Sequence, residues 1–377
     1  MIREATPADL DEILRIENAA FEQDRLSRRS LRYLLTRARA FTLVDDVGGT
    51  LRGYVLVLLR RGTSLARLYS IAVDPAARGH GIGASLVRAA EADALARDCV
   101  VMRLEIRKDN AASISLFHTL GYRPFGAYSD YYEDSTEALR YEKVLAPHLD
   151  RALLRVPFYA QTLEFTCGPA ALMMAMKALD EGIELDRRLE LRLWRESTTI
   201  YMTSGHGGCG PEGLALAAHA RGFGVRIHVN QAGPLLLESV RSAEKRTVIE
   251  LVYKDFMREV RAKGIPVRRG SVRVDDLVSA FEAGAIPIVL ISLYRFHRKR
   301  TPHWVTVTGF DERYLYVNDP WVYKAAGRTA TDCINLPIPR SEFEGMARWG
   351  RAGERAVLFV SRDGAGDGKN QDKARRS

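Results

Sequence analysis

Hydrophobic and polar positions along the first 145 or so residues alternate in short runs that predict strands separated by amphipathic helices. The first helix is expected to begin at a cap, Thr6 or Asp9, and to extend through Glu22. Strands are expected at 1–5, 40–44, 53–59, 66–73, 100–106, 122–128 and 137–144, and further helices at 31–37, 84–96 and 110–120. The last two strands should pair as a hairpin, so the pattern predicts a mixed sheet with flanking helices.

Apolar runs beyond residue 150 predict a second folded region. A helix should follow Cys167, and strands are expected at 286–293, 301–309 and 314–320. The break at 146–150 places a boundary near residue 150, and the polar run 363–377 is expected to be disordered. The sequence therefore predicts two domains, 1–148 and 151–362, and a tail at 363–377, which agrees with the domain count usual for this length.

The net charge of +9 is unevenly divided between the two regions. Residues 1–150 hold 21 basic and 21 acidic residues, whereas the remainder holds 35 basic and 26 acidic residues. The second domain is therefore expected to prefer acidic ligands. The excess is too small to indicate a nucleic-acid partner, and no motif that reads RNA or DNA is present.

An apolar content of 46% is ordinary for a globular protein, and the uncharged apolar run Ile286–Leu293 is far too short to span a bilayer. The first residues lack a signal-peptide core. The four cysteines are scattered without a Cys-x-x-Cys pair, which argues against a zinc site or a disulfide framework. We therefore expect a cytoplasmic protein with no membrane association and no metal.

A glycine-rich turn joins the strand at 66–73 to the helix at 84–96. It reads Arg78-Gly79-His80-Gly81-Ile82-Gly83 and follows Asp74-Pro75. Glycines let a ligand approach the backbone closely, and the unpaired amides at a helix start favour an anion. The glycine spacing differs from a Rossmann fingerprint, and the Gly-Lys-Ser/Thr of a P-loop is missing.

This turn resembles the Gln/Arg-x-x-Gly-x-Gly/Ala loop with which the GNAT N-acetyltransferases bind the pyrophosphate of acetyl-CoA. The resemblance implies the GNAT fold for the first domain, with acetyl-CoA as its co-substrate. The residues that it implies for cofactor binding are Ile71, Val73, Arg78, Gly79, His80, Gly81, Gly83 and Ala84.

Residues 105–122 are similar to the Glu-x-Arg-x-x-Asn…Leu-Tyr-x-x-x-Gly-Phe run of the ribosomal-protein alanine N-acetyltransferases. That resemblance implies Glu105 as the general base, acting directly or through water, and Asn110 as a contact to the pantetheine arm. It also implies that Tyr131 and Tyr132 lie beside a peptide substrate.

One position departs from that pattern. The tyrosine that serves the family as general acid is replaced by Phe117, whose ring has no proton to give. Either the CoA thiolate departs without a proton donor, or Tyr122, Tyr128, Tyr131 or Tyr132 takes over.

A second chemical signal surrounds Cys167, which lies just ahead of an apolar helix. A helix N-terminus favours a thiolate, and a thiolate nucleophile needs an imidazole with an orienting partner. His303 and Asp319 meet this need if their strands are antiparallel neighbours. His303 lies 136 residues after Cys167, as in papain-like enzymes. Gln161 is placed to donate its amide to an oxyanion.

Cys209 is the rival nucleophile, but it lacks a glutamine upstream at the same distance.

The motifs Val-Pro-x-x-x-Gln…Cys-Gly-Pro-Ala, His-Trp-Val-x-Val-x-Gly and Asn-Asp-Pro resemble those of cysteine peptidase family 39, the bacteriocin-processing leader peptidases, and their soluble relatives. The resemblance covers about residues 153–362. It implies a papain-like α+β domain with Cys167 as nucleophile and His303 as general base and acid. Asp319 would then orient the imidazole, and Gln161 would belong to the oxyanion hole.

The two resemblances together imply an α/β protein of the α+β kind with two activities. One is N-acetyltransfer to an amine, with a peptide or protein N-terminus favoured, and the other is cleavage of a peptide or isopeptide bond. The basic residues Arg295, Arg298, Lys299 and Arg300 form either a solvated loop or a surface that recruits an acidic peptide.

Two alternatives stay open. The first domain is an acetyl-CoA sensor that regulates the peptidase, or the second domain is a peptide-binding module for the acetyltransferase. The sequence does not indicate an oligomeric state.

Overall fold

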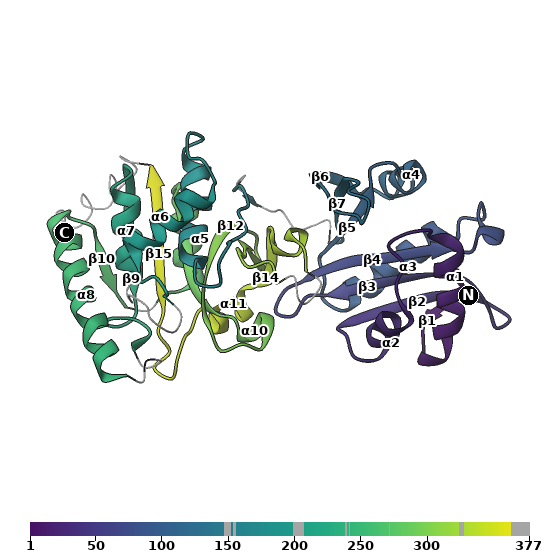
Figure 1. Ribbon diagram of the computed structural model, residues 1–377, viewed down its shortest axis with the longest axis horizontal. Coiled ribbons are helices and arrows are strands. Elements are labelled where there is room, and N and C mark those ends of the chain that lie inside the picture. Colours follow the sequence, from purple (N-terminus) through teal and green to yellow (C-terminus); the bar gives the residue numbers. More distant parts are fainter. Residues whose placement is uncertain are drawn as a thin grey trace, which may run out of the picture. The chain divides into compact units, whose positions relative to one another are not determined.

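The computed structural model describes residues 1–146, 152–153, 156–198, 207–237, 240, 242–270, 272–323 and 328–362. The chain divides into two compact units, Met1–Leu149 and Asp150–Ser377, which run from purple to blue and from teal to yellow in Figure 1. The boundary expected near residue 150 and the tail expected at 363–377 lie outside the described residues.

The first unit is a seven-stranded mixed sheet with helices on both faces. The strands follow the order β1-β2-β3-β4-β5-β7-β6. In chain order the elements are β1 (Ile2–Glu4), η1 (Pro7–Asp9), α1 (Leu10–Ala20), α2 (Arg28–Thr36), β2 (Ala40–Val47), β3 (Thr50–Leu59), β4 (Leu65–Val73), η2 (Pro75–Ala77), α3 (Ile82–Ala96), β5 (Val101–Arg107), α4 (Ala111–Thr119), β6 (Arg123–Tyr128) and β7 (Ala138–Val144).

Alternating side chains of the strands supply the two cores of this unit. One face, with Val55 and Leu104, is buried under α3 and α4, and the opposite face, with Val44 and Tyr54, is buried under α1 and α2. This period-two division is what a sheet covered on both sides requires. Helix α1 starts after a short 3₁₀ turn and ends two residues before Glu22.

Strands β4 and β5 are the only parallel neighbours in this sheet, and they separate soon after they meet. Residues 65–67 pair with 101–103, and the two strands then diverge, as Figure 1 shows. Strand β7 fills the place beside β5, so the hairpin β6–β7 is inserted with its second strand innermost. A bulge at Tyr69, between the pairs of Leu68 and Ser70, further bends β4. The result is an opening between β4 and β5.

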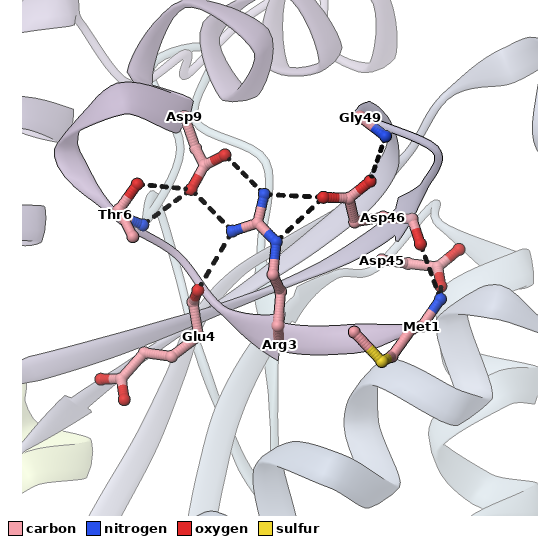
Figure 2. Close-up of polar contacts among 8 residues, drawn as sticks. All are labelled: Met1, Arg3, Glu4, Thr6, Asp9, Asp45, Asp46 and Gly49. Atoms are coloured by element: carbon pink, nitrogen blue, oxygen red, sulfur yellow. Dashed lines mark hydrogen bonds and ion pairs between the residues drawn. The ribbon is translucent and has the colours of Figure 1, made fainter.

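The start of the chain is fixed by one arginine. Figure 2 shows the Arg3 guanidinium between the carboxylates of Asp9 and Asp46, with N–O distances of 2.8 Å in both ion pairs. Asp9 also accepts hydrogen bonds from the amide and hydroxyl of Thr6. Hydrogen bonding by Arg3 therefore holds the pKa of Asp9 well below its usual range. These contacts join β1 to the turn before α1 and to the end of β2.

The described part of the second unit contains one eight-stranded sheet. Its path is β10-β9-β15-β11-β12-β13-β14, and β8 pairs with β12. The elements are β8 (Ala152–Leu153), α5 (Cys167–Leu179), α6 (Arg187–Ser197), α7 (Pro211–His219), β9 (Phe223–Val229), α8 (Ala243–Ala262), β10 (Val267–Arg269), α9 (Val274–Glu282), β11 (Ile286–Ser292), α10 (Tyr294–His297), β12 (Pro302–Phe310), β13 (Tyr314–Asn318), η5 (Ala330–Cys333), β14 (Leu336–Pro339), α11 (Arg340–Met346) and β15 (Ala356–Arg362).

Helix α5 is the centre of the second core. Its residues 168–176 are all buried, and they pack with α7 and with the face of β11 that carries Ile288 and Leu290. The opposite face of β11, with Val289, meets α9 and α11. Consecutive residues of β11 and of β12 are buried along almost their whole length, as expected for strands that are covered on both faces. No helix among the described residues is both long and apolar enough to cross a bilayer.

Candidate active sites

The opening between β4 and β5 forms a cleft of about 800 Å³ in the first unit. Its walls come from segments 20–27, 67–71, 104–107 and 131–134. The cleft brings together Glu105, Tyr131, Tyr132, Asn110 and Ile71, which the sequence analysis selected from separate motifs. Asn110 also caps α4, because its side chain accepts from the Ser113 amide at 3.0 Å.

The glycine turn has the backbone that its sequence suggests. Gly79 and Gly81 have φ values of +81° and +72°, which side chains disfavour, and no neighbouring atom lies within 4 Å of where a Cβ would stand on either. Helix α3 begins at Ile82, two residues earlier than expected, and Gly81 is its N-cap. Because glycine has no side chain, no side-chain cap occupies the first amides of the helix. The amides of the first turn therefore face an open space that suits an anion such as the pyrophosphate of acetyl-CoA.

The remaining residues selected around the turn lie beside it. The Nδ1 atom of His80 is 3.0 Å from the carbonyl oxygen of Arg78, which folds the ring back over the turn. Arg78 is exposed, and Val73 and Ala84 are half-buried. A Cβ on Gly83 would lie at ordinary van der Waals distance, 3.5 Å, from a methyl group of Leu116.

Glu105 lies in the cleft as half of a buried ion pair. Its carboxylate accepts a hydrogen bond from Nε of Arg67 at 2.9 Å, and the two side chains are only 5% and 4% exposed. Arg67 also donates to the hydroxyl of Tyr131 at 2.9 Å. A single guanidinium thus orients the carboxylate and one of the tyrosines. The sequence analysis missed Arg67, although a charge within the apolar run of β4 was a usable signal.

Two of the four tyrosines considered as replacements for the missing general acid face away from the cleft. Tyr122 is 1% exposed, packs edge-on against Phe117 and donates its hydroxyl to the sulfur of Met102. Tyr128 stacks behind Tyr131 and carries the Arg140 guanidinium over its ring. Neither tyrosine is among the residues that line the cleft, so the structure does not support either of them as the substitute acid.

Tyr131 and Tyr132 remain at the cleft. Burial raises the pKa of both hydroxyls, that of Tyr132 to about 12, so both keep their protons at neutral pH. Arg107 lies over the Tyr132 ring at 5.0 Å and bonds to Asp134 at 2.9 Å. It also approaches Asp24 in the α1–α2 loop at 3.9 Å. Arg107 therefore connects the two loops that border the cleft.

The second site is built on α5, β12 and the end of β13. Cys167 is the first residue of α5, and His303 lies on β12. Strands β12 and β13 are antiparallel neighbours, which brings Asp319 to His303. Nε2 of His303 is 2.8 Å from Oδ1 of Asp319, and the Trp321 amide donates to the same oxygen at 3.0 Å. The same ring is near enough to Cys167 for its charge and hydrogen bonding to act on the thiol.

These contacts set the charges of the pair. Burial alone raises the pKa of the Cys167 thiol, but the charge and hydrogen bond of His303, with backbone amides of Trp304 and Gly168, outweigh it and leave the pKa below its ordinary value. Burial lowers the pKa of His303, yet Asp319 and Cys167 raise it to about 9. Both shifts favour the charged forms of the pair, a thiolate at Cys167 and an imidazolium at His303.

Gln161 lies beside the Asp319 loop, because its backbone amide donates to the carbonyl of Pro320 at 2.9 Å. Its side-chain Nε2 donates to the carbonyl of Leu163 at 2.7 Å, while its Oε1 is buried without a hydrogen-bond partner. A primary amide has two N–H donors. One of them is used within the loop, which leaves the other for a further acceptor.

Glu190, on α6, holds the segment that leads to Cys167, and the sequence analysis missed it. This fully buried carboxylate accepts hydrogen bonds from the Tyr159 hydroxyl at 2.9 Å and from the amide and hydroxyl of Thr162 at 2.8 and 2.7 Å. The Thr166 hydroxyl is its fourth donor. Glutamate in a charged amphipathic helix looks like a surface residue, so nothing in the local pattern marked it.

Cys209 is close to Cys167 but in a different electrostatic setting. Its Cβ is 3.4 Å from where a Cβ on Gly168 would stand, and its carbonyl accepts from the Trp304 indole at 3.1 Å. Burial raises its pKa well above the ordinary value, which leaves it a neutral thiol. The structure thus separates the two candidate nucleophiles by charge. His206, which precedes Cys209, lies outside the described residues.

An aromatic and basic cluster borders the imidazole. The Trp321 ring is 6.2 Å from that of His303 and 5.2 Å from that of Tyr323. Lys299 lies over both Trp321 and Tyr323, at 4.8 and 4.6 Å. Arg298 donates to the Tyr294 hydroxyl at 2.9 Å. The basic loop is therefore packed on aromatic rings near the catalytic candidates.

Over the described ranges, no group of three metal-ligating side chains is assembled.

Comparisons with known proteins identify both units. The Acetyltransferase (GNAT) family model matches residues 8–122. A Bacillus subtilis protein named as a [ribosomal protein bS18]-alanine N-acetyltransferase is 28% identical over 136 residues, which are 36% of this chain and 89% of that protein. An N-alpha-acetyltransferase of Sulfolobus acidocaldarius is 30% identical over 148 residues, covering 36% of this chain and 88% of the relative.

A solved structure also matches the first unit. The ribosomal-protein-S18-alanine N-acetyltransferase of Escherichia coli is 23% identical, with a TM-score of 0.36, covering 38% of this chain and 93% of that one. The Peptidase_C39 like family model matches residues 156–361, more than half of the chain. Both resemblances drawn from the sequence are confirmed. The chain belongs to the Peptidase_C39 like family and carries, ahead of that domain, an N-acetyltransferase domain of the GNAT family.

Proposed function

We propose that this chain is a bifunctional enzyme that acetylates a peptide or protein N-terminus at one site and hydrolyses a peptide or isopeptide bond at the other. The hydrolase part of the proposal rests on one observation, which is that the His303 ring interacts with both Cys167 and Asp319. The acetyltransferase half is supported by the cleft and by the relatives, some of which are named for acting on protein N-termini.

Acetyl-CoA would supply the acetyl group as an activated thioester. The residues proposed to hold it are Gly79, Gly81 and the first-turn amides of α3 at the pyrophosphate, with Arg78 adding charge. Asn110 is proposed to contact the pantetheine arm. The backbone amide at the Tyr69 bulge lies outside the regular ladder and is proposed to polarise the acetyl carbonyl.

Glu105 is the proposed general base for the acceptor amine, with Arg67 fixing the direction of its carboxylate. Tyr131 and Tyr132 are the proposed proton donors in place of the residue that Phe117 replaces, because both remain protonated and border the cleft. They are also the proposed contacts to a peptide acceptor.

At the second site the Cys167 thiolate would attack the carbonyl carbon of the scissile bond. The oxyanion would accept from the second N–H of Gln161, and His303 would pass its proton to the leaving amine. His303 would then remove a proton from the water that hydrolyses the acyl-enzyme, while Asp319 keeps the ring oriented. The proposed substrates are peptides, with acidic sequences favoured by the basic loop at 298–300.

A cytoplasmic location is part of the proposal. All four cysteines are free thiols, and a catalytic thiolate survives best in a reducing compartment. Fractionation of cells that express the chain tests this, and recovery from an oxidising compartment would count against it.

The two activities should be separable by single substitutions. A library of hexapeptides with free N-termini, incubated with the protein and isotope-labelled acetyl-CoA, is read by mass spectrometry. Wild type should give labelled and shortened peptides. Glu105→Gln should lower labelling by about 100-fold and spare cleavage, because it removes only the base. Cys167→Ala should abolish cleavage and spare labelling. Cleavage that survives Cys167→Ala, or labelling that never appears in wild type, would overturn the corresponding half.

Charge reversal in the basic loop should change peptide preference. Arg298→Glu combined with Lys299→Glu removes the cations beside the aromatic cluster, so cleavage of acidic peptides should fall about tenfold relative to neutral ones. The matched control is Arg268→Glu with Arg269→Glu, an equal charge change on exposed residues of β10. A ratio of acidic to neutral cleavage that stays at the wild-type value in Arg298→Glu with Lys299→Glu would contradict a role in recruitment.

Glu190→Gln should disable the hydrolase without touching the acetyltransferase. The amide replaces one acceptor oxygen by a donor that faces the donors of Thr162 and Thr166, which displaces the segment before Cys167. Cleavage and alkylation of Cys167 should both slow roughly 100-fold. Glu196→Gln, on the same helix but paired with Arg221 at the surface, serves as control. Unchanged alkylation in Glu190→Gln would show that this residue does not position the nucleophile.

A further inference from the structure

A buried carboxylate that the proposed mechanism leaves unused borders the acetyltransferase cleft. Glu17, on α1, is 1% exposed and lies in the cleft wall. Its Oε1 accepts from the Leu26 amide at 2.7 Å, and its Oε2 accepts from the Tyr54 hydroxyl. A buried carboxylate is costly to keep unless it is hydrogen-bonded or serves a purpose.

The hydrogen bond from Tyr54 continues toward the cleft. The Tyr54 hydroxyl, fully buried on β3, is 2.8 Å from Oγ of Ser70 on β4. Ser70 lies in the cleft wall and directly follows the bulge at Tyr69. Two hydroxyl groups therefore link the cleft, at the strand where the acetyl group is proposed to lie, to the Glu17 carboxylate.

Acetylation of a primary ammonium requires two proton acceptors. The nitrogen carries three protons as the ammonium and one as the amide product. One proton leaves before the nitrogen can attack, and the second leaves as the C–N bond forms and the C–S bond breaks. The proton that the thiolate gains comes from Tyr131 or Tyr132, so the two protons of the nitrogen go to other groups, and a basic group of the protein can take each of them. Glu105 accounts for one of them.

We propose that Ser70, Tyr54 and Glu17 form a proton relay that removes the second proton from the acceptor nitrogen. Ser70 takes the proton from nitrogen and passes its own to Tyr54, which passes its own to Glu17, so the carboxylate becomes a carboxylic acid. The charges balance, since one ammonium, two carboxylates and one tyrosine become two carboxylic acids, one CoA thiol and one tyrosinate, which a carboxylic acid then reprotonates. This inference rests on the proposed acetyltransferase function.

The surroundings of Glu17 suit a group that accepts and returns a proton. Burial raises the pKa of its carboxyl, while the Leu26 amide, the Tyr54 hydroxyl and the nearby charge of Arg25 lower it in part. Burial also raises the pKa of Tyr54 far above its ordinary value. Tyr54 therefore passes a proton on without persisting as a phenolate, and Glu17 is the end of the relay.

The test combines kinetics with a measurement on the ligand-free protein. Tyr54→Phe and Ser70→Ala each remove one hydroxyl, and each should lower kcat for peptide acetylation about 100-fold. The loss should shrink as the pH rises, because deprotonation by solvent then replaces the relay. Tyr141→Phe is the control, because it removes a hydroxyl from a buried tyrosine in the α3 core. In ¹³C-glutamate NMR without acetyl-CoA, one carboxyl signal should titrate with a raised pKa. That signal should be missing from the spectrum of Glu17→Gln. In Tyr54→Phe its pKa should be higher still, because a hydrogen bond to the carboxylate is lost.

The outcomes separate the relay from the function on which it depends. Acetylation by wild type together with wild-type kcat and pH profile in Tyr54→Phe and Ser70→Ala would reject the relay alone. A loss in these variants that is equal at every pH would indicate a structural defect and would also reject it. No acetylation of any library peptide by wild type would reject the proposed function itself. An unshifted Glu17 carboxyl signal would reject Glu17 as the final acceptor, whatever the kinetics.

Discussion

One buried hydrogen bond, between the His303 ring and the Asp319 carboxylate, determines what the second domain is able to do. It engages Nε2 of the ring, and together with the charges of Asp319 and Cys167 it raises the pKa of His303 to about 9. The effect is clearest by comparison with Cys209, which is also buried but has a raised pKa. Burial acts on both thiols in the same direction, and only the one beside the oriented imidazole has a pKa below its ordinary value.

In the first domain the comparable constraint is the course of two strands, β4 and β5. Strands β4 and β5 pair over three residues and then diverge, which opens the interior of a sheet that would otherwise be closed. Charged groups along that opening are held by partners, as Glu105 is by Arg67 and Glu17 by the Leu26 amide. In both domains, therefore, a reactive group is available at low solvent exposure because neighbouring strands position its partner.

Local patterns were enough to predict most strands, the glycine turn and the approach of His303 to Asp319, since each depends on short-range periodicity or on neighbouring strands. They did not reveal that β7 lies between β5 and β6, because a hairpin pattern does not say which strand joins the sheet. Glu17 and Glu190 also escaped notice. On a helix of mixed polarity, a buried glutamate and an exposed one have the same sequence signature, and only the tertiary donors distinguish them.

The most direct test of this account is a titration of the Cys167 thiolate by its ultraviolet absorbance, taken as the difference between wild type and Cys167→Ala. The pKa of Cys167 is lowered and that of His303 is raised, so the ion pair should exist at neutral pH. The thiolate signal should therefore be present at pH 7 and disappear only on acidification well below about 8.5, the value of a free thiol. A signal that is absent at pH 7 and appears only as the pH rises through about 8.5 would contradict the account.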